Sequence, residues 1–173
     1  MASELTVQTL RGPTSGANAD TVLIPSGQTL YAPGHVVQVV HNISTGQVST
    51  GSSSYANTGL TATITPKRSD SKVLVIVGQP MSFSIATTSA REGYWNICRG
   101  TTQLIEGGSS FDLTENNTFQ ITAFGNNLTY LDSPATTAAT TYKTQMRVSA
   151  GTSDIYVGYG NTSGTMILME IAQ

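Results

Sequence analysis

Residues that could catalyse a reaction or bind a metal are few in this sequence, and they are scattered along it. His35 and His41 are the only two histidines, and they lie on or beside a valine-rich stretch in which alternate residues share a face. Two imidazoles could supply two metal ligands, but no third ligand follows at a recognisable spacing. We therefore expect a surface or interface pair of histidines, with a metal-ligand pair as the alternative.

The other groups that could do chemistry are equally isolated. Asp112 and Glu115 come nearest to a carboxylate pair, and their loop-like surroundings favour a turn cap or a solvated pair over a glycosidase dyad. Serine is abundant, but no Gly-x-Ser-x-Gly turn occurs. Cys98 is the only cysteine, which excludes an intramolecular disulfide, and its strand-like context predicts a small buried residue. We predict no enzyme, no cofactor and no metal.

Composition narrows the class of partner. Only 10% of the residues are charged, against roughly 25% in an average globular protein, and the net charge is −2. A surface of hydroxyl and amide groups is typical of a protein that is covered by copies of itself or by partners. The eight Lys and Arg residues are dispersed, apart from the pair Lys67-Arg68, so no basic patch for nucleic acid is predicted. No signal peptide and no membrane-spanning run is recognisable, and we expect a soluble product of the cytoplasm.

Hydrophobic patterning predicts the strands on which these surface groups lie. Residues 60–64 alternate between apolar and threonine side chains, whereas residues 73–77 are continuously apolar and suit a strand buried on both sides. The polar loop between them, residues 66–71, predicts a hairpin. The last stretch, residues 166–171, is apolar on nearly both faces and is expected in the middle of a sheet. The predicted core residues on these three strands are Leu60, Ala62, Ile64, Val73, Val75, Val77, Ile167, Met169 and Ile171.

The whole pattern predicts an all-β protein. At least eight short strands separated by Gly, Asn and Ser turns, with no extended helical periodicity, favour a jelly-roll-like antiparallel β-sandwich over residues 35–173. Residues 1–34 form a separate region, an extended N-terminal β arm whose short segments are too small for a core of their own. Packing on its own sandwich or on a neighbouring subunit should order this arm. Its apolar residues are therefore the candidates for contact with a capsid or another partner: Leu5, Val7, Leu10, Val22, Leu23, Ile24, Leu30 and Tyr31.

Several stretches resemble a β-sandwich domain that recurs in virion proteins of tailed bacteriophages of aquatic hosts. They are TGLTATITP at residues 58–66, SKVLVIV at 71–77, TMILMEI at 165–171, and the lead-in LIPSGQTL at 23–30 followed by APGHVV at 32–37. The resemblance implies a homotrimeric virion protein that is made in the host cytoplasm, assembled on the particle and bound to the major capsid protein or another virion protein.

The resemblance covers two kinds of virion protein. Fibre proteins generally carry a longer N-terminal anchor or shaft, so the expectation is a head decoration (cement) protein that stabilises the capsid shell. The alternative is a short tail-fibre or receptor-binding module whose loops touch host surface glycans. A third hypothesis is a carbohydrate-binding module of TNF-like or C1q-like shape. The strand order, the residues on a trimer axis and the partner itself do not follow from the sequence.

Overall fold

The computed structural model divides the chain into two units, Met1–Tyr31 and Ala32–Gln173. It describes residues 9, 12–17, 21–26, 28, 30, 32–85, 91–111, 120–124, 127–149 and 153–173. The described residues of the first unit form no strand and no helix. The predicted boundary between residues 34 and 35 stays a prediction, as does the β character of the arm. No helix in the described part of the chain is long and apolar enough to cross a membrane.

The second unit is built from strands, as predicted. The described elements are β1 (Val36–Ser44), β2 (Val48–Thr50), β3 (Ala56–Ile64), β4 (Lys72–Gly78), β5 (Met81–Ile85), β6 (Arg91–Arg99), β7 (Thr102–Phe111), β8 (Gln120–Phe124), β9 (Asn127–Asp132), β10 (Thr140–Val148), β11 (Ser153–Val157), a 3₁₀ turn η1 (Tyr159–Asn161) and β12 (Gly164–Ile171). They form three four-stranded sheets with the orders β1-β12-β4-β9, β3-β10-β6-β7 and β2-β11-β5-β8. All strand pairs are antiparallel.

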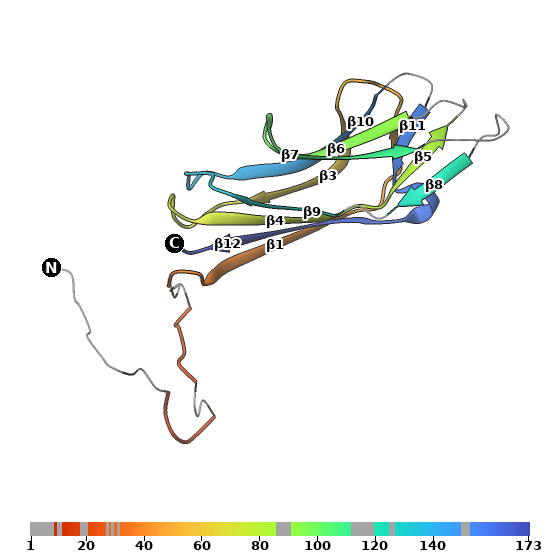
Figure 1. Cartoon of the computed structure of the whole chain (residues 1–173). Coiled ribbons are helices and arrows are strands. Elements are labelled where there is room, and N and C mark those ends of the chain that lie inside the picture. The colour runs from red at the N-terminus through yellow and green to blue at the C-terminus, as the bar shows by residue number, and fades with distance from the viewer. Residues whose placement is uncertain are drawn as a thin grey trace. The chain divides into compact units, whose positions relative to one another are not determined.

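The first two sheets make the jelly roll. Figure 1 shows them as two layers, with the third sheet extending one end. Counted along the chain, the eight strands of the two layers follow the orders 1-8-3-6 and 2-7-4-5, so the chain passes repeatedly from one layer to the other. This is the double Greek key of a jelly-roll sandwich. As predicted for the last stretch of the chain, β12 lies inside its sheet, between β1 and β4.

The predicted hairpin between β3 and β4 is wrong. β3 pairs with β10, whereas β4 pairs with β12 and β9, so the two strands lie in opposite sheets. The loop between them therefore crosses the sandwich instead of turning within one sheet. β4 is also not buried on both sides, because its burial alternates: Val73, Val75 and Val77 point into the core, while Leu74 and Ile76 are only half-buried.

The core consists of two apolar clusters. The first lies between the two layers and contains Leu60, Ala62, Ile64, Val73, Val75 and Val77 from the predicted set, together with Ile97, Tyr142, Met166 and Leu168. The second cluster includes residues of the third sheet and is made by Met81, Phe83, Trp95, Met146, Val148, Ile155 and Val157.

The structure corrects the predicted face of β12. Met166 and Leu168 enter the core, and Glu170 is also buried, whereas Ile167, Met169 and Ile171 lie on the other face and are half-buried. A strand that is apolar on both faces carries no signal for which set points inward. The registers with β1 and β4 decide it, because a shift of one residue exchanges the two faces.

Candidate interaction surfaces

All four strands of sheet β1-β12-β4-β9 place aliphatic side chains on its outer face, together with a few polar residues. Directly paired residues lie on the same face, and one row across the sheet reads Val39, Met169, Leu74 and Leu131. The next row contains Ile167 and Ile76 between His41 and Thr129. We call this surface the apolar sheet face and define it by Val36, Val39, Ile43, Leu74, Ile76, Leu131, Ile167, Met169 and Ile171.

The apolar sheet face is open to solvent in the single chain. Val39, Ile43, Leu131 and Val36 are 55%, 53%, 47% and 41% exposed. In the rows of paired residues that make up this face, Lys72 and His41 are the only ionisable residues, and the His41 imidazole is hydrogen-bonded to the Thr165 hydroxyl at 2.8 Å. Four strands about 4.8 Å apart and some six residues long span about 400 Å², which is within the range of the largest apolar patches on monomeric proteins, and such patches are often functional.

The outer face of the other layer is polar. Arg147 lies over the rings of Tyr94 and Tyr55, at 3.9 and 5.2 Å from the ring centroids, and its Nη2 is 3.9 Å from Glu106 Oε1. The Tyr55 hydroxyl donates to Glu106, and the Tyr94 hydroxyl donates to Glu92. Desolvation and the hydrogen bond to Glu106 raise the pKa of Tyr55 well above its usual range, so the phenol stays a neutral donor. The two faces of the sandwich therefore differ sharply in chemistry.

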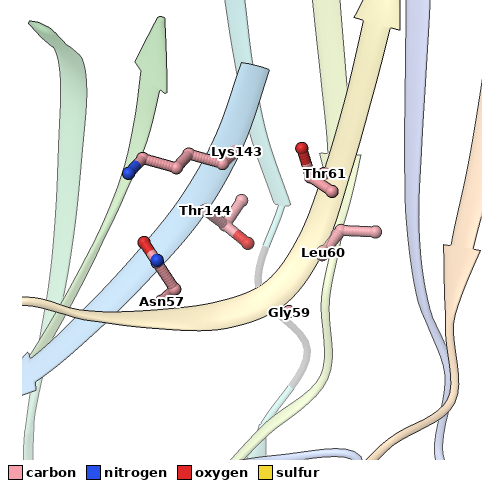
Figure 2. A pocket seen from close by; sticks show the side chains of 6 residues that line it. All are labelled: Asn57, Gly59, Leu60, Thr61, Lys143 and Thr144. Atoms are coloured by element: carbon pink, nitrogen blue, oxygen red, sulfur yellow. The ribbon is translucent and has the colours of Figure 1, made fainter. Parts of the chain in front are cut away.

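A shallow hollow of about 200 Å³ lies beside a bulge in β3. It is lined by Asn57, Gly59, Leu60, Thr61, Lys143 and Thr144, which are drawn in Figure 2. The bulge places three residues of β3 opposite the single residue Thr144, and Gly59 accommodates it with a φ of +86°.

The polar groups behind this hollow are satisfied within the protein. The buried Thr144 hydroxyl donates to Gln79 Oε1 at 2.8 Å and is hydrogen-bonded to the Thr58 hydroxyl. The Gln145 amide donates to Asn57 Oδ1 at 3.0 Å. Lys143 is thus the one cation that lines the hollow. The threonine hydroxyl groups behind the hollow need no ligand to complete their hydrogen bonding.

The candidate catalytic residues do not form a site where the structure describes them. Within those residues, no group of three or more His, Cys, Asp and Glu side chains is placed to hold a metal ion. A register shift between Val36 and Gln38 breaks the simple alternation by which His35 and His41 were expected to share a face. Asp112 and Glu115 lie outside the described residues.

Cys98 is buried, as predicted, but its thiol lies among amides instead of in an apolar cluster. It is 2% exposed, and Gln145 Oε1 and Asn96 Oδ1 lie 3.2 Å and 3.4 Å from Sγ as the acceptors available to its single S–H group. Desolvation raises the pKa of the thiol, and the charge of Lys143 opposes this shift only partly. The cysteine is therefore a protonated structural group at neutral pH.

Half of the predicted contact residues of the arm are described. Val22, Leu23, Ile24 and Leu30 are 44%, 60%, 43% and 51% exposed. The others, Leu5, Val7, Leu10 and Tyr31, lie outside the described residues. The described large apolar side chains with the greatest exposure are thus gathered on the arm and on the apolar sheet face, with Tyr159 as the one other case.

Sequence reasoning missed the apolar sheet face as a surface. Ile167, Met169 and Ile171 were assigned to the core, and Val39, Ile43, Leu74 and Ile76 were recognised only as parts of strands. The available signal was the apolar character of both faces of β4 and β12, which exceeds what a single core needs.

No family model matches the chain, and no curated protein matches it. Two solved structures of infectious bursal disease virus are similar at 13% sequence identity. The structure of the Gx strain has a TM-score of 0.35 and covers 94% of this chain, and the VP2 subviral particle has a TM-score of 0.33 and covers 93%. This chain spans 46% of the length of each matched chain. At such scores the likeness is no basis for a function, and the jelly-roll assignment depends on the strand order described above.

Proposed function

We propose that this protein is a structural component of a virus particle, and specifically a trimeric head decoration protein of a tailed bacteriophage. The observation that carries the proposal is the apolar sheet face, on which four strands present aliphatic side chains to solvent. Exposed apolar patches of this size are often functional, and the subunit of an assembly needs a surface of this kind. The sequence resemblance to phage virion domains supports a tailed bacteriophage as the virus particle.

The proposed partners follow from the chemistry of the surfaces. Low charge and exposed aliphatic residues suit contact with copies of the same chain and with the major capsid protein. Decoration would stabilise the shell because a ligand that binds only the assembled lattice lowers the free energy of that state. We place the contact with the shell on the arm, whose apolar residues begin with Leu5, Val7 and Leu10.

The first experiment is to count and locate the protein in purified particles, by quantitative gel analysis and low-resolution imaging. Decoration predicts hundreds of copies distributed over the head. A few to a few dozen copies at the tail would overturn this proposal and favour the tail-fibre module. Absence of the protein from particles would reject a virion role altogether.

Removal of the beginning of the arm tests which region holds the shell. Deleting residues 2–11 should abolish binding to capsids that lack this protein, and should leave the thermal unfolding of the sandwich unchanged, because residues 32–173 form a unit with its own core. Binding is measured by co-sedimentation with capsids. A truncated protein that still decorates heads would show that the arm is not the anchor.

A further inference from the structure

We infer that the apolar sheet face is the docking site for residues 22–30 of the arm of a second copy of this chain. Both surfaces are aliphatic, and together they account for nearly all the strongly exposed large apolar side chains that the structure describes. An arm-to-face contact would cover both at once. Removing apolar surface from water is favourable in proportion to the area buried, so contact between the two surfaces is favoured over exposure of both to water.

Residue spacing makes this contact feasible. The arm joins the sandwich at Gly34 and His35, which are held by backbone hydrogen bonds to Ala172, at 2.8 Å from Gly34 N to Ala172 O and 2.9 Å from Ala172 N to His35 O. These bonds fix the root of the arm next to Ile171, at one end of the apolar sheet face. Ten residues of extended chain reach about 30 Å, whereas the face is about 20 Å long. Residues 22–30 are therefore long enough to extend over the whole length of such a face.

The area favours a contact that includes the arm over simple packing of two faces. The face alone offers about 400 Å², roughly half of the 800 Å² per partner that a standard interface buries. Face-to-face packing alone would thus be a weak contact. When each copy gives its arm to one neighbour and receives an arm from another, every copy buries both its face and its arm, and such head-to-tail contacts close into a ring when the rotation between copies closes.

An arm that folded onto its own face would instead remove both apolar surfaces from the assembly. The choice of a second copy rests on the proposed function, which requires copies of the chain to associate. The polar face with Arg147 is the less suitable partner, because its charged groups already pair with one another.

Disulfide trapping between two different chains tests the inference directly. Both chains carry Cys98→Ala, which removes the only natural thiol. A tagged chain with Leu23→Cys is mixed with an untagged chain with Val39→Cys and oxidised; both positions are more than half exposed, so neither change disturbs the core. We expect a mixed disulfide dimer of the two chains. The matched control, Thr141→Cys on the exposed outer side of β10, should give no mixed dimer above background.

Two outcomes would overturn the inference. One is equal cross-linking of Leu23→Cys to Val39→Cys and to Thr141→Cys. The other is a chain carrying both Leu23→Cys and Val39→Cys that closes its disulfide only within itself, while the mixed pair gives no dimer.

The oligomeric state gives an independent readout. Val39→Asp should convert the oligomer to a monomer by light scattering while the monomer keeps the far-UV circular dichroism of the wild type, whereas Thr141→Asp should leave the mass unchanged. An oligomer that survives Val39→Asp and Leu23→Asp would also overturn the arm contact.

A monomeric wild-type chain that still decorates heads would refute the arm exchange and leave decoration standing. Mixed disulfides in a protein that is absent from heads would support the arm exchange and refute decoration.

Discussion

At the scale of single residues, the buried carboxylate of Glu170 explains how the loop between β3 and β4 is held. Its oxygens accept from the Gln38 amide at 2.6 Å, from the backbone N–H groups of Lys67 and Arg68 at 2.8 and 3.4 Å, and from the Ser71 side chain. Desolvation alone would raise the pKa of Glu170, but these four donors outweigh it and lower the pKa. One charge thus fixes the crossing from one sheet to the other.

Replacing Glu170 with Gln should lower the free energy of unfolding by about 1–3 kcal/mol at pH 7, because an amide cannot accept from all four donors. The folded pKa lies below the unfolded value, so the stabilisation is fully present above the unfolded pKa and is lost as the pH falls through the folded one. Urea unfolding between pH 7 and pH 3 measures this. The wild type should lose stability over that range more steeply than Glu170→Gln.

The control for this variant is Asp70→Asn, in the same loop. Asp70 pairs with Arg68 at 2.8 Å, but both side chains are about half exposed, so the loss should stay within about 1 kcal/mol. If Asp70→Asn lowers the free energy of unfolding as much as Glu170→Gln does, the loss comes from the general charge of the loop and not from the buried acceptor.

At the scale of elements, the junction between the jelly roll and the third sheet depends on a close approach of β6 to β5. A Cβ at Gly93 would lie 2.0 Å from Cε2 and 2.3 Å from Cζ of the buried Phe83 ring, and 3.1 Å from Ile155 Cδ1. The absence of a side chain in β6 is therefore what lets Phe83 fill the second apolar cluster. A glycine inside a strand commonly marks such an approach.

Gly93→Ala should destabilise the protein by about 1–3 kcal/mol or more, since the ring must leave its position in a packed core. Thermal or urea unfolding measures the loss, and Phe83→Leu should recover part of it in the double variant. Gly46→Ala is the matched control, because no atom lies within 4 Å of its added Cβ and it should be nearly neutral. Equal effects at the two glycines would contradict the proposed contact.

At the scale of the whole molecule, the two outer faces of the sandwich differ in their chemistry. One is aliphatic, with Lys72 and His41 as its ionisable groups, and the other carries the cluster of Arg147, Glu106 and two tyrosines. Salt screening does not weaken apolar contacts, whereas it weakens contacts between charges. Salt dependence therefore reports which face is covered in an assembly.

Self-association should change little between 0.05 and 0.5 M sodium chloride, because it buries the apolar sheet face. Sedimentation equilibrium at several salt concentrations measures the association constant. The Arg147→Ala variant serves as the control and should associate like the wild type. A steep loss of association with salt, removed by Arg147→Ala, would place the interface on the polar face instead.

Some of this architecture follows from local sequence alone. The alternation of Leu60, Ala62 and Ile64 predicts a strand with one buried face, and these residues are 1%, 5% and 1% exposed. Gly100-Thr101 predicts the tight turn that joins β6 to β7, and Gly100 has the positive φ that such a turn needs. Period-two patterning and turn residues act over a few positions, so the class of fold could be predicted without any long-range contact.

The tertiary structure decided the rest. The sequence by itself could not say that β3 and β4 lie in opposite layers, nor which face of β12 is inside. The row of Val39, Met169, Leu74 and Leu131 exists only because strands distant in the chain pair in one register. A strand that is apolar on both sides fits the core and an interface equally well, and its neighbours choose between them. The local pattern determined the strands, and composition determined the low charge of the surface. Non-local pairing determined which apolar residues remain exposed.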